Sequence, residues 1–286
     1  MSARQRWAFI TFGAGLPNWR AAARRLENEA KVSGWFDVSV AFTDRDLPRL
    51  FPQFTERHVS LLSRSIRGYG YWVWKPYLIG EMLRTLGNQY SGVAYMDAGC
   101  QLNPSGESAC KKMAAYFDMA QAEGAFAMHL PEHREDAWSR LATMDYLNLD
   151  KSLRESPQIQ SGIVFVTRRS DALVQQWFDA CTAEDYAYVM DGAETELNAP
   201  GFVAHRHDQS IFSGLAKGHG VMTIPDETFW APQWATTGRS YPIWAPRNRT
   251  RIRIEATGLS NRTVRFVEKA YSRGLVVGSR VAPRFR

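Results

Sequence analysis

WAFITFGAGLPNWRAAARRLENEAKVSGWFDVSVAFT, residues 7–43, is the stretch that decides the fold. It opens with a short apolar run, residues 7–13, which ends at a Gly-Ala-Gly-Leu-Pro breaker and predicts a buried strand. Residues 17–31 then place apolar side chains at helical spacing behind a proline, which is tolerated in the first helical turn. Residues 37–43 alternate as a second strand. A strand, a helix and a strand in this order predict a parallel sheet with crossover helices.

The same alternation continues to about Pro225, so residues 1–238 are expected to form one α/β domain. Further strands are predicted at 92–100, 124–129, 158–167 and 221–225, and further helices at 75–87, 105–121, 132–149, 170–182 and 205–220. The chain has 286 residues, of which 45% are hydrophobic, so it has ample apolar surface for a large core.

The positive charge of the chain is concentrated at its C-terminal end. The net charge is +6, yet residues 239–286 carry twelve Lys and Arg against Glu255 and Glu268, a balance of 12 − 2 = +10. The remainder therefore carries 6 − 10 = −4. We expect a basic C-terminal extension on a mildly acidic main domain.

The cysteines and the termini indicate the compartment. Cys100, Cys110 and Cys181 are few, odd in number and without a metal-type spacing, so no disulfide framework is expected. The N-terminal region lacks the apolar core of a signal peptide, and no apolar run approaches the length of a membrane span. These features predict a soluble protein of the reducing cytoplasm.

Ligands of open α/β sheets collect beyond the carboxyl ends of the strands, which makes Asp97 informative. It follows the apolar run 92–96 and precedes Ala98 and Gly99, which would let a bulky ligand approach the backbone. A carboxylate in this position can hold a divalent cation. An aspartate that caps the following segment is an equally good interpretation of the residues alone.

Cations lie upstream of Asp97, in and just before the segment RGYGYWVWKPY, residues 67–77. Arg64, Arg67 and Lys75 would suit a diphosphate, whose negative charge they would neutralise. The alternative is a solvated basic face over buried aromatics. Gly68 and Gly70 argue against it, because a glycine-flanked aromatic loop is a poor way to build a core.

The segment HRHDQS, residues 205–210, is the second polar cluster. On an extended segment His205 and His207 face the same side and could share a metal, and Asp208 is a candidate general base or acceptor-orienting carboxylate. Taken alone, the cluster is more typical of a helix start that Asp208 caps.

Several common catalytic motifs are absent. The stretch HLPEH, residues 129–133, contains Pro131 and lacks the glutamate that a zinc-protease motif needs after its first histidine. The sequence also lacks a dinucleotide-binding GxGxxG, a Walker A motif, GxSxG and CxxC.

Together, GYGYW-WKPY, Y-DAG, QI--G and HRHDQS, in this order over roughly residues 7–225, resemble GT-A-fold glycosyltransferases. The closest likeness is to bacterial enzymes of capsule, lipopolysaccharide and exopolysaccharide assembly, and a more distant one is to the glycogenin-like and lipopolysaccharide galactosyltransferase family. The resemblance implies a Rossmann-like, mixed and mostly parallel sheet flanked by helices. It also implies transfer of a hexose from a nucleotide sugar, typically a UDP-hexose, to a glycan acceptor.

The resemblance also assigns roles by position. Asp97 and Asp208 would be catalytic, and Asp97 with His207 would hold Mn²⁺ or Mg²⁺. The residues implied at the acceptor are His207, Asp208 and Gln209. The residues implied at the donor are Thr11, Gly13, Asp44, Arg67, Lys75, Asp97, Gln158, Ser161 and Gly162.

One departure from the family pattern concerns the metal. Gly99 stands where the family has the second aspartate of its DxD motif. Either His207, Asp208 or His219 supplies another ligand, or cationic side chains do part of the work. A catalytically degenerate relative remains an alternative.

Two other functions fit the sequence less well. A sugar nucleotidyltransferase expects a glycine-rich basic signature near the N-terminus, of which FGAGLPNWR is a poor version. A nucleic-acid-binding module would use the basic extension and its aromatics, but it leaves the acidic main domain unexplained. We instead expect no nucleic-acid partner, and an extension that leans on the anionic inner face of the cell membrane, where lipid-linked acceptors reside and each basic residue adds about 1 kcal/mol.

Overall fold

The computed structural model describes residues 5–193, 197–228, 237–251 and 253 of the chain. The basic stretch from residue 254 onward, on which the predicted membrane contact depends, lies outside the described residues. Among those that are described, no helix combines the length and apolar character that crossing a membrane requires.

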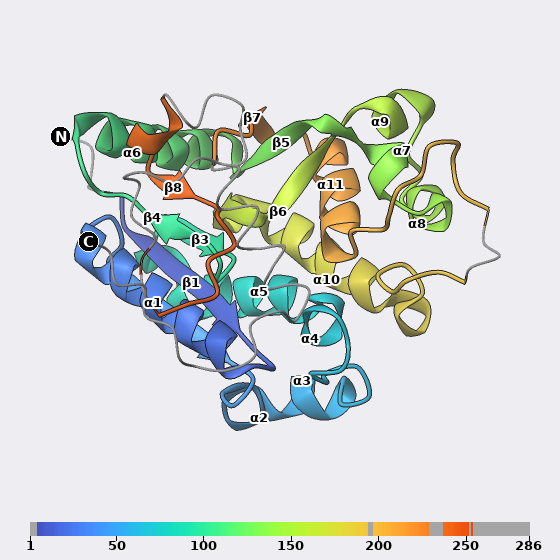
Figure 1. Cartoon of the computed structure of the whole chain (residues 1–286), viewed down its shortest axis with the longest axis horizontal. Helices are drawn as coiled ribbons and strands as arrows, with labels where there is room; N and C mark the ends of the chain where they lie inside the picture. The colour runs from blue at the N-terminus through green and yellow to red at the C-terminus, as the bar shows by residue number, and fades with distance from the viewer. Residues whose placement is uncertain (1–4, 194–196, 229–236, 252, 254–286) are drawn as a thin grey trace, which may run out of the picture.

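The core of the fold is a six-stranded sheet in the order β2-β1-β3-β6-β5-β7 (Figure 1). Strand β6 runs antiparallel to both of its neighbours, and the other pairs are parallel. The predicted mixed, mostly parallel sheet is therefore confirmed. The strands of this sheet are β1 Trp7–Gly13, β2 Val38–Thr43, β3 Gly92–Met96, β5 Ala125–Arg134, β6 Pro157–Val166 and β7 Met222–Pro225.

This topology fixes where a site can form. The carboxyl ends of the five parallel strands and the start of β6 lie at one edge of the sheet. Loops at this edge can converge on one ligand.

Helices cover both faces of the sheet (Figure 1). The longer ones are α1 Pro17–Ser33, α5 Trp74–Leu86, α6 Glu107–Glu123, α10 Asp171–Tyr186 and α11 Asp208–Gly218. The shorter ones are α2 Leu47–Leu50, α3 Pro52–Arg57, α4 Gly68–Tyr71, α7 Glu135–Trp138, α8 Leu141–Tyr146 and α9 Lys151–Glu155, with 3-10 turns at Gly87–Gln89, Arg168–Ser170 and Gly238–Ser240.

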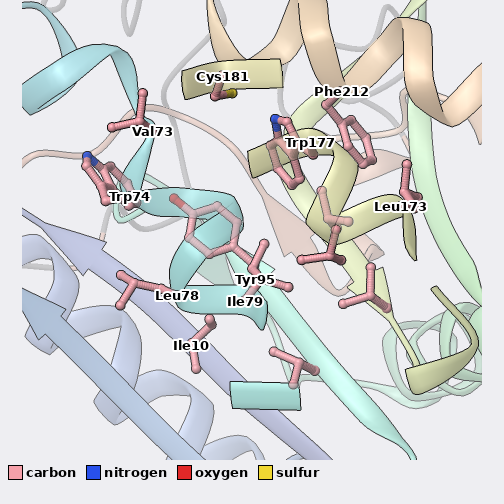
Figure 2. Close-up of a cluster of buried hydrophobic side chains, with 14 of the residues drawn as sticks. Ile10, Val73, Trp74, Leu78, Ile79, Tyr95, Leu173, Trp177, Cys181 and Phe212 are labelled. Carbon is pink, nitrogen blue, oxygen red and sulfur yellow. The ribbon is translucent and has the colours of Figure 1, made fainter. Parts of the chain in front are cut away.

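Alternation along the strands divides the core between the two faces. In β1, Trp7 and Phe9 pack with residues of α1 and α6, whereas Ile10 packs on the opposite face. Figure 2 shows that second cluster, in which Ile10 and Tyr95 of the sheet lie with Leu78 of α5 and Trp177 of α10. Burial of these large side chains fixes α5 and α10 on the sheet.

One prediction of local structure was wrong. Residues 132–149 do not form one helix, because β5 continues to Arg134, which pairs with Pro157, and only then do the short helices α7 and α8 follow. Strand pairing with β6 captures residues that a local pattern assigns to a helix. The expected loop at 67–74 contains the short turn α4, and Tyr69, Tyr71 and Trp72 in this segment adopt left-handed φ values of 56°, 49° and 61°.

The described part of the C-terminal extension packs on the main domain. Strand β8, Ile243–Trp244, pairs antiparallel with β4, Gln101–Leu102, which follows Asp97 closely in the chain. We call residues 243–250 the strap. It lies against the loop that carries Asp97, so the extension begins as part of the site's surroundings.

Candidate functional site

Asp97 lies at the carboxyl end of β3, where its backbone N–H donates to Gly162 O at 2.8 Å. Its Oδ1 accepts a hydrogen bond from the Tyr95 hydroxyl at 2.6 Å. Its Oδ2 faces Gly162 so closely that a Cβ there would come within 2.9 Å of it. The side chain is 44% exposed. Asp97 therefore offers one oriented carboxylate oxygen to a ligand.

A buried ion pair lies next to Asp97, on the side of its carboxylate that faces the protein interior. Lys75 is 2% exposed, and its Nζ lies 2.8 Å from Asp208 Oδ2 and 3.5 Å from Asp97 Oδ1. Ser161 Oγ accepts from Lys75 at 3.1 Å and donates to Asp208 Oδ2 at 2.8 Å. Burial opposes the charge of Lys75, but the two carboxylates outweigh it and raise the pKa of the ammonium.

The predicted contacts of Lys75 with the diphosphate and of Asp208 with the acceptor need correction. Both side chains are closed off by protein, because Lys75 sits in the first turn of α5 and Asp208 begins α11, and both helices pack on the sheet. Burial raises the pKa of Asp208, with Lys75 and Ser161 opposing it. These residues position Asp97 and cannot touch a substrate from where they lie.

Gln158 was predicted to line the sugar pocket, but it is fully buried. Its Nε2 donates to Glu135 Oε1 at 3.0 Å, and its Oε1 accepts from Gln209 Nε2 at 2.7 Å. Ser161 is likewise buried. Only Gly162 of this group lies directly against Asp97, so the predicted pocket is in fact a polar layer beneath the site.

Glu135 anchors that layer, and sequence reasoning missed it. It is fully buried, bonds Lys217 at 2.7 Å and accepts from the hydroxyls of Ser139 and Ser213. No signal in the sequence could have found it, because it lies in a polar stretch assigned to a helix. Tyr95 was findable, since its position two residues before Asp97 places both side chains on the same side of an extended segment.

The two histidines do not share a site for a metal. His205 Nε2 donates to Tyr188 O at 3.0 Å and its Nδ1 accepts from Arg140 N at 3.3 Å, so both ring nitrogens are engaged. His207 Nδ1 donates to Val189 O at 2.9 Å. Its Nε2 has no hydrogen-bond partner in the part of the chain described, and Asp191 Oδ1 lies 3.8 Å away. Burial lowers the pKa of both rings and so favours their neutral forms.

The residues present fit the predicted Mn²⁺ or Mg²⁺ poorly. A Cβ on Gly99 would lie 2.9 Å from Arg247 Cα, so the second aspartate of a DxD motif has no room. Within the described ranges, no group of three or more His, Cys, Asp or Glu could hold a metal ion. The ammonium of Lys75 already lies 3.5 Å from Asp97 and offsets its charge.

One arginine joins the Asp97 loop to the strap. Arg25 Nη2 donates to Ala98 O at 3.1 Å, Cys100 O at 2.9 Å and Asn248 O at 3.3 Å. Arg25 Nε donates to Thr250 O at 3.2 Å. Asn248 N also donates to Gly99 O at 2.8 Å. The loop and the strap are therefore held as one unit.

Three arginines create a positive region at this edge. The Arg206 guanidinium stacks over Trp138 at 4.0 Å. Burial, with the positive charges of Arg247 and Arg67, lowers the pKa of Arg206 to about 10. Only Arg67 was predicted for the site. Crowded guanidinium groups favour an anionic ligand such as a diphosphate.

The ends of β1 and β2 form the other predicted donor region. Asp44 accepts from Arg20 Nε and Nη2, both at 2.6 Å, and from Gly15 N at 3.3 Å. Burial opposes ionisation of Asp44, but Arg20 outweighs it and the pKa is lowered. Thr11 is 1% exposed, so its predicted contact with the donor is wrong. A Cβ on Gly13 would lie 2.2 Å from Trp19 O, so this glycine lets α1 pack on β1.

No protein-family model matches the chain, and no curated protein matches it significantly. Among solved structures, it is similar to a glycosyltransferase involved in the glycosylation of the major capsid of PBCV-1, at 9% identity and a TM-score of 0.46, covering 92% of this chain and 99% of that one. It is similar to mouse xyloside xylosyltransferase 1 at 12% identity and a TM-score of 0.43, covering 87% and 100%. It is also similar to the galactosyltransferase LgtC, solved with donor and acceptor sugar analogs, at 13% identity and a TM-score of 0.45, covering 93% and 95%. These solved structures are glycosyltransferases, and a likeness this distant assigns no role to any residue of the site.

Proposed function

We propose that this protein is a glycosyltransferase that moves a hexose from a nucleotide sugar, a UDP-hexose, to a glycan acceptor. The observation that carries the proposal is Asp97. Its half-exposed side chain presents a carboxylate at the edge where the strand ends meet, oriented by Tyr95 and backed by the buried Lys75. A carboxylate that neighbouring side chains orient, and that lies beside a positive region, suits a ligand with both hydroxyl groups and phosphates.

The diphosphate, the sugar and the nucleoside of the donor each contact different residues along this edge of the sheet. The diphosphate lies against the positive region of Arg67, Arg206 and Arg247, which offset the charge that develops on the leaving UDP. Asp97 Oδ2 accepts a hydrogen bond from a hydroxyl of the donor. The nucleoside lies toward Gly15 and Asp44, where the Tyr69 ring lies 3.9 Å from the position of a Cβ on Gly15.

The first experiment is a thermal-shift panel of UDP-, GDP-, ADP- and CMP-sugars, each with MnCl₂ and with EDTA. Selective stabilisation by one UDP-sugar identifies the donor, because a ligand that binds the folded state raises its melting temperature. Asp97→Asn should then lower donor hydrolysis and transfer by about tenfold or more. A panel in which no nucleotide sugar stabilises or is hydrolysed rejects the proposal. Binding without any turnover identifies a catalytically degenerate relative instead.

The biological role we propose is synthesis of a bacterial surface polysaccharide, such as a capsule or lipopolysaccharide, at the inner face of the cell membrane. Residues 254–286 carry seven Lys and Arg against Glu255 and Glu268, a balance of 7 − 2 = +5. Deletion of residues 254–286 should weaken binding to anionic phosphatidylglycerol vesicles and leave UDP-sugar binding intact. The deletion starts at 254 because the strap supports the Asp97 loop. Unchanged vesicle binding would contradict the membrane role.

A further inference from the structure

A cavity of about 390 Å³ opens between α6, the end of β7 and the turn near Tyr241. Strand β7 is parallel to β3 through the intervening strands, so the cavity and Asp97 lie at the same edge of the sheet. Its volume falls in the range of about 300–1,000 Å³ that is typical of small-molecule sites. Its lining includes Lys112, Met119, Ile224, Asp226, Glu227 and Thr237.

The charged groups that line the cavity already have partners in the described part of the protein, except for one carboxylate oxygen of Asp226. Lys112 Nζ bonds both carboxylate oxygens of Glu227, at 2.9 and 2.6 Å, and the Tyr116 hydroxyl also donates to Glu227. Asp226 Oδ1 accepts from the backbone N–H and the hydroxyl of Thr228, at 3.1 and 2.8 Å. No described residue donates to Asp226 Oδ2. The cavity therefore offers a ligand one carboxylate oxygen and no uncompensated cation, which suits a neutral, hydroxyl-rich molecule better than a phosphate.

A side chain of β6 connects this carboxylate to Asp97. Gln160 Nε2 donates to Asp226 Oδ1 at 3.4 Å. Gln160 Oε1 lies 3.9 Å from the position of a Cβ on Gly162, and Asp97 Oδ2 lies 2.9 Å from that same position. The amide of Gln160 therefore stands between the two carboxylates.

We propose that this cavity binds the acceptor glycan and that Asp226 accepts the proton of the reacting acceptor hydroxyl. The inference rests on the proposed function and names its second substrate site. The acceptor oxygen forms a bond to the anomeric carbon of the donor sugar, and the bond from that carbon to the diphosphate oxygen breaks. The electron pair leaves with UDP, and the acceptor proton passes to Asp226. Asp208 cannot fill this role, because Lys75 and Ser161 occupy its reachable oxygen and the side chain is 4% exposed.

Burial raises the pKa of Asp226, with the bonds from Thr228 and Gln160 opposing it. A carboxylate with a raised pKa is a stronger base while it is still ionised at neutral pH, which is what proton transfer from a sugar hydroxyl requires.

The test compares three variants with the donor that the thermal-shift panel identifies. Asp226→Asn removes the base, Ala115→Phe fills the cavity from α6, and Ala114→Phe places the same ring on the adjacent, exposed position as a control. Transfer is measured to a panel of p-nitrophenyl glycosides, and donor binding is measured by thermal shift. Asp226→Asn should keep the donor-induced shift and lose about 100-fold or more of transfer. Ala115→Phe should raise the acceptor KM about tenfold or more, and the control Ala114→Phe should leave it within about twofold of wild type.

The outcomes separate the inference from the proposed function. Transfer within about twofold of wild type in both Asp226→Asn and Ala115→Phe overturns the inference while the glycosyltransferase stands. When no donor is found, saturation-transfer NMR with methyl glycosides tests the cavity directly. Signals in wild type and Ala114→Phe that vanish in Ala115→Phe support the site. Equal signals in all three proteins, or none in wild type, overturn it.

Discussion

The backbone of Arg247 lies directly against Gly99: a Cβ on Gly99 would come within 2.9 Å of Arg247 Cα. The strap thus occupies the space that a side chain at position 99 would need. The glycine that replaces the second aspartate of the DxD pattern is therefore explained by the course of the strap, which leaves no room for a side chain at position 99.

Gly99→Ala should destabilise the protein by about 1–3 kcal/mol, because the new methyl group forces the strap backbone away. The measurement is urea denaturation at neutral pH. Gly218→Ala is the matched control, since a Cβ there meets nothing within 4 Å and alanine is a better helix former. Equal stability of Gly99→Ala and wild type would show that the strap is not held against the loop.

Donor binding should not depend on divalent cations. The shift in melting temperature caused by the UDP-sugar is expected to agree within about 1 °C in EDTA and in MnCl₂. Side chains carry the charge at this edge, and Asp97 has an ammonium 3.5 Å away. Loss of the shift in EDTA, restored by Mn²⁺, would instead support the metal predicted from the sequence.

Lys75→Met should destabilise the fold by about 3–5 kcal/mol, because it leaves Asp208 buried without its partner. The double variant Lys75→Met with Asp208→Asn should recover much of that loss, since the uncompensated charge is gone. Urea denaturation of the four proteins of this cycle gives the coupling. Lys31→Met, which breaks an exposed pair with Glu27, should change stability by less than about 0.5 kcal/mol. No recovery in the double variant would contradict the pairing.

Tyr95→Phe should lower donor hydrolysis about tenfold, because Asp97 Oδ1 loses the hydroxyl that orients it. The loss of stability should be about 1.5–3 kcal/mol, the usual value for a hydrogen bond to a charged group. Tyr90→Phe is the control, since Tyr90 precedes β3 at the opposite edge of the sheet and bonds Arg6. Wild-type hydrolysis in Tyr95→Phe would show that the hydroxyl does not position the carboxylate.

Stability should fall as the pH is lowered below about 6.5, the usual value for histidine. The pKa of His205 is far lower in the folded state because of burial, so the unfolded chain binds more protons in this range. Protonation would also turn Nδ1 into a donor against the Arg140 N–H that it now accepts. His205 alone should contribute up to about 1.4 kcal/mol per pH unit to this slope. Unfolding in urea at pH 7.5 and pH 5 checks it. His205→Gln should flatten the slope and the exposed His219→Gln should not. An unchanged slope in His205→Gln would refute this assignment.

Much of the fold could be predicted from periodicity, because the strands alternate between two helix-covered faces and the helices carry one apolar stripe each. The antiparallel direction of β6 could not, since it depends on how distant segments pair and not on local pattern. The same tertiary pairing extends β5 to Arg134 and overrides a helical pattern there.

The site divides in a similar way. The strand-end rule found Asp97, and applied to β7 it would also have found Asp226. Sequence motifs placed Lys75, Asp208 and Gln158 near that edge, but they could not show how deeply these side chains are buried. Burial depends on which helix face packs on the sheet, and these three side chains lie beneath the site.

The contacts of Arg25 also determine when the site can be completed during synthesis of the chain. One guanidinium joins Cys100 to Asn248, residues that lie 75 and 223 positions from it in sequence. During synthesis the carbonyl groups of the Asp97 loop therefore gain their final neighbours only after the strap has been made. Ribosome-bound chains that stop before the strap would carry an incomplete site, so catalytic competence should appear only once the strap has been synthesised.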